Sequence, residues 1–360
     1  MRAAVLHSIE DGKIAIQEDV EALGPGPGEV RIKIRAAGVC HSDLSARNGG
    51  LPQPVPAILG HEAAGDIIAV GEGVTDTAVG DRVIVNWLPA CGECASCLRH
   101  EPYLCTYYVM MAYMSPRFLV GGTPAFGLAG TGAFAEEMVV PEAGVVKIGA
   151  DVPYDVASLV GCGVMTGVGA AINTAQVKPG STVVVIGCGG VGISAIQGAR
   201  VCGADAIVAV DMNESKLELA RRFGATHVAT PDTFEEVKTL VTMGEGFDYA
   251  FEVVGLPQTI KAAWQAARRG GMVVVVGAGR QDQTVEFTPF DLLFEAKTLV
   301  GSVYGSADAI RDYHRVLDLW RAGRLDLEGM ISHKIRLDDV DEALGALGRG
   351  DVIRQVIYYD

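Results

Sequence analysis

An apolar strand that runs directly into a glycine-rich turn constrains the fold of this chain most. Residues 183–186 are Val-Val-Val-Ile, and Gly187-Cys188-Gly189-Gly190-Val191-Gly192 follows, before an apolar helix expected to begin near Ile193. In such a turn one glycine allows the tight bend, the next lets backbone approach a pyrophosphate, and the last lets helix and strand pack closely. A second apolar strand ends at Asp211, about 20 residues on, where a carboxylate can bind a ribose hydroxyl. The pattern predicts a dinucleotide-binding turn, with an empty α/β turn as the alternative.

The same acid distinguishes between the two nicotinamide cofactors. A carboxylate at Asp211 would repel the 2′-phosphate of NADP, and Met212 and Asn213, which follow it, provide no arginine to bind that phosphate. Lys216 stands close enough in sequence to reach the adenosine ribose. The sequence therefore predicts that the cofactor is NAD.

Two different patterns of apolar residues follow one another along the 360 residues, and they predict two domains. A chain of this length is longer than a single domain with one hydrophobic core usually is. Up to about residue 160, short β-rich runs such as 30–34 and 82–85 are broken by glycine and proline, which is typical of an irregular antiparallel β region. After residue 182, nearly all-apolar strands alternate with helices, which predicts a doubly wound parallel sheet covered on both faces. The expected strands are 183–186, 207–210, 249–254, 272–276 and 299–303, and the expected helices include 214–223, 258–268, 307–322 and 337–347.

Charge and composition exclude several classes of protein. The chain has 29 Lys and Arg against 44 Asp and Glu, and its net charge of -15 would repel the phosphates of nucleic acids and anionic membranes. With 49% apolar and 20% charged residues, the composition does not fit a disordered chain. We find neither a run of ~18 unbroken apolar residues nor the apolar region of a secretory signal. A cytoplasmic globular protein is expected, and its cysteines should be thiols or metal ligands before disulfides.

Four of the eight cysteines form a compact C-x2-C-x2-C-x7-C motif, namely Cys91, Cys94, Cys97 and Cys105. Two-residue gaps fold thiolates onto one point, and four sulfurs suit a closed, structural zinc site. An iron–sulfur cluster can use similar spacing, but Thr106 stands where the usual companion proline would follow. Four unrelated buried thiols are the remaining alternative.

Further candidate ligands are spread widely along the chain: Cys40, His61, Glu62 and Cys162. Two sulfurs and one imidazole would leave a fourth zinc position open to water or substrate, as catalysis requires. Taken singly, each residue is more often a core cysteine or an ordinary histidine, and sequence spacing alone does not join them.

These motifs resemble those of the zinc-dependent medium-chain alcohol dehydrogenases, and the overall pattern resembles their class III-like bacterial branch. The stretch Gly60-His61-Glu62-Ala63-Ala64-Gly65, followed by Gly71 and Val74, is similar to the family's zinc signature G-H-E-x2-G-x5-G-x2-V. The four-cysteine motif, Cys162, the glycine-rich turn and Asp211 follow in the family's order. The resemblance implies a Rossmann NAD-binding domain, residues 164–304, inserted in a mostly β, GroES-like catalytic domain, residues 1–163 and 305–360.

The resemblance also implies a role for individual side chains. It places a catalytic zinc on Cys40, His61 and Cys162, with Glu62 as a nearby or occasional fourth ligand, and so implies two zinc ions per chain. Asp43 would orient His61. The implied cofactor contacts are His41 and Arg354 at the pyrophosphate, Thr166 and Val191 behind the nicotinamide, and Gly187, Gly189, Gly190 and Gly192 in the turn. For Arg354, a solvated surface arginine is the alternative.

The reaction that the resemblance implies is a hydride transfer between an alcohol and NAD. Zinc would lower the pKa of the alcohol oxygen, and Ser42 would pass its proton along the nicotinamide ribose toward solvent. Several members of the family end this relay with a histidine three residues after the serine, where this chain has Ser45. The expected exit is therefore water or His41.

The expected substrate is a primary alcohol with an apolar or aromatic body, or the matching aldehyde. Glutathione-type members bind an adduct's carboxylates through an arginine that Val109 replaces here, and Gly49 and Leu51 replace an acidic pair. Aromatic and sulfur-containing side chains occupy this region instead: Tyr107, Tyr108, Met110, Met111, Tyr113, Met114 and Phe118. We expect Tyr108 and Met111 to line the substrate pocket with Trp87; alternatively, the run packs the cysteine lobe against its neighbour.

Two other functions stay open from the sequence. One is a formaldehyde dehydrogenase that depends on a thiol carrier of the mycothiol type. The other is a non-catalytic nucleotide-binding protein, against which the intact set of Cys40, His61 and Cys162 argues. The resemblance further implies a homodimer or homotetramer, with residues 272–276 and 299–303 near the interface.

Overall fold

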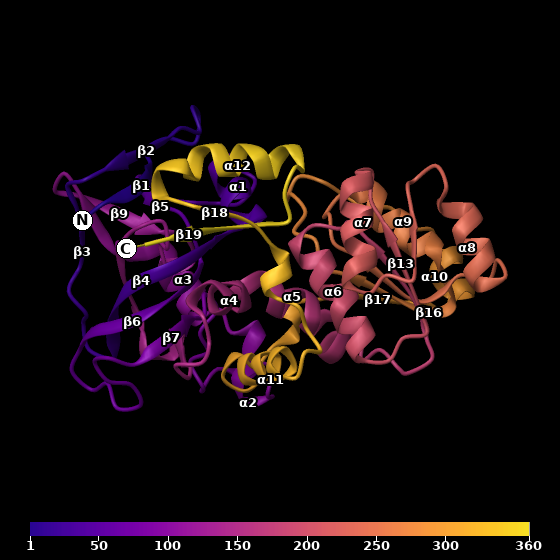
Figure 1. Cartoon of the computed structure of the whole chain (residues 1–360), viewed down its shortest axis with the longest axis horizontal. Coiled ribbons are helices and arrows are strands. Elements are labelled where there is room, and N and C mark those ends of the chain that lie inside the picture. Colours follow the sequence, from indigo (N-terminus) through magenta and orange to yellow (C-terminus); the bar gives the residue numbers. More distant parts are fainter. Residues whose placement is uncertain (360) are drawn as a thin grey trace. The chain divides into compact units, whose positions relative to one another are not determined.

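The computed structural model describes residues 1–359, apart from the side chains of Val109 and Tyr113, and its contacts divide the chain into two compact units (Figure 1). The first unit contains Met1–Cys162, Asp308–Leu317 and the residues from Leu327 onward, and the second contains Gly163–Ala307 and Asp318–Asp326. The second unit therefore interrupts the first in sequence. Residues 318–326, which were predicted to belong to the catalytic domain, group with the second unit. The catalytic and NAD-binding roles of the two parts stay predictions.

Two sheets form the first unit. One has the strand order β11-β7-β6-β4-β19-β18, with β10 also paired to β4, and the other has the order β2-β1-β5-β9-β8-β3. Most neighbouring strands are antiparallel, as the short runs broken by glycine and proline predicted. The strands are β1 Ala3–Leu6, β2 Ile14–Gln17, β3 Val20–Ala22, β4 Glu29–Val39, β5 Ala57–Ile58, β6 Glu62–Val70, β7 Arg82–Val85, β8 Phe118–Val120, β9 Thr123–Gly127, β10 Glu137–Pro141, β11 Val145–Lys147, β18 Ile331–Ile335 and β19 Arg354–Tyr358.

The central strands β4 and β6 position the residues of interest. β4 alternates between buried and half-buried side chains up to Arg35, because only one of its faces meets the core. Its last residues are all buried, and α4 packs against both β4 and β6. Gly38 pairs with Glu62, so the end of β4 lies beside the beginning of β6. The helices associated with this unit are α1 His41–Arg47, α2 Ala95–Leu98, α3 Tyr107–Met114, α4 Tyr154–Leu159, α11 Ala309–Arg321 and α12 Val340–Arg349.

The second unit is a parallel sheet in the order β14-β13-β12-β15-β16-β17. The order reverses between β12 and β15, which is the position where open α/β sheets bind ligands. This arrangement confirms the predicted doubly wound sheet. The strands are β12 Thr182–Ile186, β13 Ala206–Val210, β14 His227–Ala229, β15 Phe247–Glu252, β16 Ala267–Val275 and β17 Thr298–Gly301, and the helices are α5 Met165–Gly169, α6 Gly190–Val201, α7 Glu214–Phe223, α8 Phe234–Thr242, α9 Pro257–Ala266 and α10 Pro289–Glu295.

Local signals explain where the predicted helices begin and end. α7 has the predicted bounds because the Asn213 side chain accepts a hydrogen bond from the N–H of Ser215, and Gly224 ends the helix at a φ of 119°. α9 ends before its predicted limit because Ala267 already begins β16. Single 3-10 turns occur at Pro102–Leu104, Leu128–Gly130, Glu142–Gly144, Val303–Ser306, Glu328–Met330 and Leu337–Asp339, and π-helical turns occur at Val160–Val164 and Ala170–Thr174.

One helical stretch, Tyr154–Thr174, is long and apolar enough to cross a membrane, with a mean hydropathy of 1.6. However, 89% of its most apolar window is buried inside the protein. It is therefore a core helix.

Candidate active site

The predicted ligands Cys40, His61 and Cys162 meet although they are distant in sequence. Cys40 follows β4, His61 precedes β6, and these two strands are antiparallel neighbours. Cys162 lies in the π-helical turn Val160–Val164 that follows α4. One donor atom from each of these residues and a carboxylate oxygen of Glu62 lie within 4.8 Å of one another, and all four side chains are buried.

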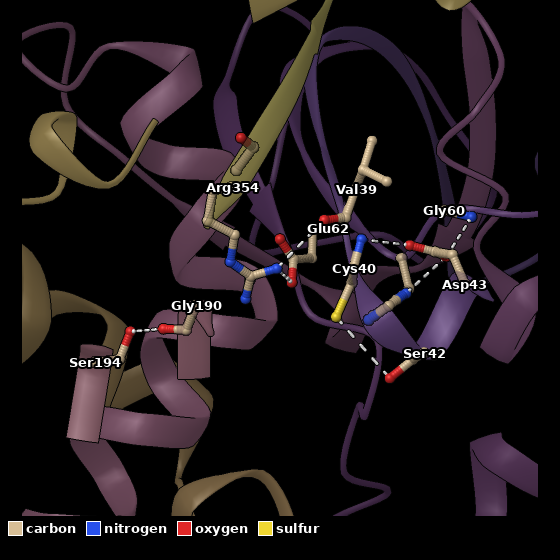
Figure 2. A network of polar contacts seen from close by, with 12 residues as sticks. Val39, Cys40, Ser42, Asp43, Gly60, Glu62, Gly190, Ser194 and Arg354 are labelled. Atoms are coloured by element: carbon tan, nitrogen blue, oxygen red, sulfur yellow. Dashed lines mark hydrogen bonds and ion pairs between the residues drawn. The ribbon is translucent and has the colours of Figure 1, made fainter. Parts of the chain in front are cut away.

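Asp43 fixes the geometry of this group (Figure 2). Its carboxylate is completely buried and accepts hydrogen bonds from the backbone N–H of Cys40 at 2.9 Å and of Gly60 at 2.8 Å. Its Oδ1 also lies 3.2 Å from Nδ1 of His61. One carboxylate therefore ties the beginning of α1 to the turn and the imidazole that precede β6. The role of Asp43 in orienting His61 stays a prediction.

The imidazole of His61 is prepared to bind a metal ion. When Nδ1 donates its proton to Asp43, Nε2 presents a lone pair, and this buried Nε2 has no hydrogen-bond partner among the described residues. Burial alone would lower the pKa of His61, but the Asp43 carboxylate raises it well above its ordinary value, so a metal ion bound at Nε2 would replace a proton there. A buried nitrogen without a partner beside two thiols fits a zinc ion, for which nitrogen and sulfur are common ligands.

The thiols of Cys40 and Cys162 are hydrogen-bonded to each other. The hydrogen bond from Cys162 holds the pKa of Cys40 well below its ordinary range, and the same contact raises the pKa of Cys162. His61 also lowers the pKa of Cys40. These contacts therefore favour the thiolate form of Cys40, which is the form that binds metals.

Glu62 and Arg354 form a buried ion pair beside the ligands (Figure 2). Arg354 Nη1 lies 3.1 Å from Glu62 Oε1, and a Cβ at Gly38 would lie 2.2 Å from Glu62 Oε2. Gly38 therefore provides the space for this carboxylate. Burial raises the pKa of Glu62 to about 8, although Arg354 opposes this shift. The solvated surface arginine is a wrong alternative, since Arg354 is 3% exposed; its contact with pyrophosphate stays a prediction.

The predicted proton-relay residues lie at the beginning of α1. His41 is exposed, and Ser42 is half-buried with its Oγ 4.0 Å from Cys40 Sγ. The Ser42 hydroxyl therefore lies beside one of the predicted zinc ligands. The relay through Ser42 and His41 stays a prediction.

The four cysteines of the C-x2-C-x2-C-x7-C motif form a second cluster, with ligand sulfurs within 4.8 Å of one another. Sγ of Cys97 lies 3.5 Å from that of Cys94 and 4.0 Å from that of Cys91. Sulfurs placed tetrahedrally at ~2.3 Å from one zinc ion are ~3.8 Å apart, so this spacing fits. The N–H of Cys91 also donates to Cys105 Sγ. Four sulfurs would fill all four positions around a zinc ion and leave none for a substrate. The structural role of this cluster stays a prediction.

The glycine-rich turn has the backbone that the sequence predicted. Gly187 has a φ of 101°, which favours glycine, and a Cβ at Gly192 would lie 1.8 Å from the carbonyl oxygen of Gly187. A Cβ at Gly189, by contrast, would meet no atom within 4 Å. The N-terminus of α6 thus begins beside open space where a pyrophosphate can approach backbone N–H groups.

Asp211 lies beside this turn, at the end of β13. Its carboxylate accepts hydrogen bonds from the N–H of Cys188 at 2.8 Å and of Asn213 at 2.9 Å. It is half-buried, as is Lys216. The carboxylate is therefore fixed where a ribose could reach it, and its negative charge would repel a 2′-phosphate there.

The residues predicted to lie behind the nicotinamide are close neighbours in the second unit. Thr166 lies on α5, and Val191 lies in the first turn of α6. The two helices pack so tightly that a Cβ at Gly167 would lie 2.3 Å from the carbonyl oxygen of Val191. Their contact with a nicotinamide stays a prediction.

Glu252 is a residue that the sequence analysis missed. It is completely buried at the end of β15, and its Oε1 accepts hydrogen bonds from the N–H groups of Val254 and Gly255 and from the Thr259 hydroxyl. This carboxylate fixes a turn that touches the glycine-rich one, since a Cβ at Gly187 would lie 2.8 Å from the Val254 side chain. The available signal was a charged residue at the carboxyl end of an apolar strand.

The predicted substrate residues separate into two groups. Trp87 meets His61 edge-on, with ring centroids 6.2 Å apart, and it lines a small, partly open hollow of about 10 Å³ with Tyr108 and Ala112. Polar residues, namely Asn86, Arg117 and Thr131, also line this hollow. Met111 was predicted to line the pocket, but it is exposed. The rest of the run also divides: Tyr107, Met110 and Met114 are exposed, Phe118 is buried in the core, and the side chains of Val109 and Tyr113 lie outside the described residues.

Helical periodicity explains this separation. Positions 108 and 112 lie one turn apart on the face of α3 that meets the hollow, whereas positions 107, 110, 111 and 114 point elsewhere. The sequence could not indicate which face is inward, because α3 is apolar all round.

Comparison with known proteins identifies relatives along the whole chain. Residues 26–150 match the family "Alcohol dehydrogenase GroES-like domain", and residues 190–321 match the family "Zinc-binding dehydrogenase". The chain is 35% identical to S-(hydroxymethyl)glutathione dehydrogenase of Paracoccus denitrificans and 36% identical to alcohol dehydrogenase class-3 of Cereibacter sphaeroides, over 100% of each chain. The crystal structure of benzyl alcohol dehydrogenase from Acinetobacter calcoaceticus superposes with a TM-score of 0.93 at 32% identity, over 100% of this chain and 99% of that one.

Proposed function

Because the chain belongs to the zinc-dependent medium-chain alcohol dehydrogenases, we propose that it oxidises primary alcohols with an apolar or aromatic body and reduces the matching aldehydes. The family supports an oxidoreductase that uses NAD and zinc. The observation that supports the substrate class is the pair of aromatic side chains at the hollow, Trp87, which meets His61 edge-on, and Tyr108. Arg117 also lines the hollow, but its charge is paired with Glu29. Such a surface favours apolar groups over charged ones.

The residues that would hold the catalytic zinc are Cys40, His61 and Cys162. When bound there, zinc supplies a Lewis acid that lowers the pKa of an alcohol oxygen. Asp43 orients the imidazole and, through the N–H of Cys40, the first sulfur. Burial, which raises the pKa of Glu62 to about 8, and the Arg354 guanidinium, which offsets the carboxylate when it ionises, both limit the negative charge beside two thiolates.

Ser42 is the proposed acceptor of the alcohol proton. Its Oγ lies 4.0 Å from Cys40 Sγ, and a hydroxyl can accept one proton while it donates another. His41 is exposed on the adjacent position of α1, and an imidazole can accept a proton on one nitrogen and donate one from the other. Ser45 stands where several relatives have a histidine, and a serine has no imidazole to carry the proton. The proton is therefore proposed to leave through His41 or water.

The second unit is proposed to bind NAD at the glycine-rich turn. The open space at Gly189 and the N-terminus of α6 would receive the pyrophosphate, and Asp211 would bind a ribose hydroxyl. Lys216, one turn into α7, would contact the same ribose.

A thiol-dependent formaldehyde dehydrogenase is the second candidate, and the names of two relatives favour it. Recognition of a glutathione adduct requires charged groups to bind the adduct. In this chain the positions that carry such groups in glutathione-type relatives are occupied by Val109, Gly49 and Leu51. The benzyl alcohol dehydrogenase similarity favours the first candidate. We therefore propose direct oxidation of the alcohol without a thiol carrier.

The proposal predicts that kcat/KM rises along the series ethanol, butanol and hexanol. Each methylene that the bound alcohol buries contributes about 0.8 kcal/mol, which corresponds to about a fourfold increase in kcat/KM per buried methylene. Steady-state kinetics with NAD and no thiol measures this. The Tyr108→Ser variant should flatten the slope for the longer alcohols, whereas Tyr107→Ser, on the exposed face of the same helix, should not. A series that is flat or falls in the unaltered enzyme would contradict the proposal.

A dimer is also proposed, through the outer edge of the parallel sheet. β17 is the last strand in the order, so its outer backbone groups are open to pairing, and Leu299 and Phe294 beside it are exposed. The same edge on a second copy, related by two-fold symmetry, would pair with these backbone groups and cover these apolar side chains. β16 is an inner strand, so residues 272–276 cannot form this edge. Light scattering should give twice the chain mass of 37.7 kDa or a multiple of that dimer, and a mass of one chain would contradict the proposal.

The cytoplasm is the proposed compartment, because free thiol ligands persist there.

A further inference from the structure

A buried tyrosine from the C-terminal part of the chain contacts the turn that carries Cys162. Tyr313, on α11, is completely buried in the first unit. Its hydroxyl lies 3.1 Å from the carbonyl oxygen of Gly161 and 3.4 Å from that of Val85, at the end of β7. One hydroxyl thus links two backbone segments that are far apart in sequence.

The backbones of these two segments pack closely. A Cβ at Gly161 would lie 2.9 Å from the carbonyl oxygen of Val85 and 3.7 Å from Cα of Glu62. The turn therefore packs directly on the end of β7 and on the beginning of β6. In a π-helical turn the backbone departs from the regular α-helical hydrogen-bond pattern, and such turns are common at functional sites.

Both segments lead to the candidate active site. Cys162 is the residue after Gly161, and Trp87, which meets His61 edge-on, follows Val85 closely in sequence. A displacement of the Gly161 carbonyl would move the Cys162 sulfur relative to Cys40 and His61. A displacement of Val85 would move the aromatic wall.

We propose that Tyr313 is a positioning residue, whose hydroxyl holds the Cys162 turn against β7 and so sets the geometry of the zinc ligands. The proposal rests on the assignment of Cys162 as a ligand. Groups that hydrogen-bond around a metal site and orient its ligands commonly change metal affinity when they are removed. The tyrosine ring fills space in the core, and its hydroxyl has one proton, which the two carbonyl oxygens share and of which Gly161 is the nearer acceptor.

The test replaces Tyr313 by phenylalanine, which keeps the ring and removes the donor. In the Tyr313→Phe enzyme, a chelating dye should extract one of the two zinc ions about tenfold faster than from the unaltered enzyme, and the other ion at the same rate. In the cobalt-substituted enzyme the visible absorption of the thiolate-bound ion should shift. Neither readout depends on turnover.

The Ile14→Val variant is the matched control for a general loss of stability. Ile14 is buried in β2, in the same unit, and loses one methyl group in this change. We expect the zinc release and the cobalt spectrum of Ile14→Val to equal those of the unaltered enzyme. Equal zinc release from Tyr313→Phe and Ile14→Val would overturn the proposal, as would a Tyr313→Phe chain that cannot fold, since Tyr313 would then act only through the core.

The same measurements separate this proposal from the assignment on which it rests. If Cys162→Ala retains both zinc ions, then Cys162 is not a ligand, and the proposed site is wrong. If Cys162→Ala retains one ion while Tyr313→Phe behaves as the control does, then the site stands and only the role of Tyr313 is wrong.

Discussion

The Cys162→Ala variant is expected to lose alcohol oxidation to below detection while it retains one zinc ion per chain. An open catalytic site has three protein ligands, so the loss of one removes a third of its protein coordination. The closed cluster of Cys91, Cys94, Cys97 and Cys105 does not include Cys162 and should keep its ion. Turnover with NAD and the zinc content of the purified protein are the two measurements.

Binding of NADH should survive this substitution, because the glycine-rich turn belongs to the second unit. Quenching of tryptophan fluorescence by NADH would check this and show that the chain is folded. Cys202→Ala is the matched control, since Cys202 is a half-buried thiol outside both ligand clusters and should keep full activity and two zinc ions. Identical zinc contents in the unaltered enzyme and Cys162→Ala would contradict the assignment.

Local patterns predicted the second unit well. The apolar strands at 183–186 and 207–210 and the helix at 214–223 were recognisable because each element has a short-range signal, such as the Asn213 cap and Gly224. The strand His227–Ala229 was missed because it has only three residues and carries a histidine, so it shows no apolar run. Strand pairing gave that segment its conformation, which no local pattern encodes.

The two metal sites differ in how far the sequence could predict them. The four-cysteine cluster is local, and its spacing alone indicated a common centre. Cys40, His61 and Cys162 meet only because β4 and β6 are antiparallel neighbours and α4 packs on both, which is a long-range property. A resemblance was needed to connect them, and the contact between Arg354 and Glu62 could not be inferred from either residue.

The direction in which a side chain points was the least predictable property. Tyr108 and Met111 looked equivalent in sequence, but only Tyr108 lines the hollow. The helix that carries them is apolar on all sides, so its pattern contains no information on which face is buried.

The second large effect concerns the thiol carrier, and benzyl alcohol is the most informative substrate. Burial of an aromatic ring contributes about 1.5–3 kcal/mol, which corresponds to a gain of about tenfold to a hundredfold in kcat/KM over ethanol. A hydrophobic pocket discriminates only moderately between apolar groups, so we expect broad specificity among them. The tripeptide of a glutathione adduct has two carboxylates, whereas Arg117, the one cation among the described residues that line the hollow, is already paired with Glu29. Binding both carboxylates there would leave buried charges unpaired.

The most direct measurement of the proposed function is kcat/KM with NAD for benzyl alcohol without a thiol, compared with formaldehyde in the presence of glutathione or mycothiol. The aromatic lining beside His61 predicts strong activity on benzyl alcohol and no increase of formaldehyde oxidation by either thiol. Strong activity only on a formaldehyde–thiol adduct, with benzyl alcohol no better than ethanol, would contradict the proposed substrate and establish the thiol-dependent function instead.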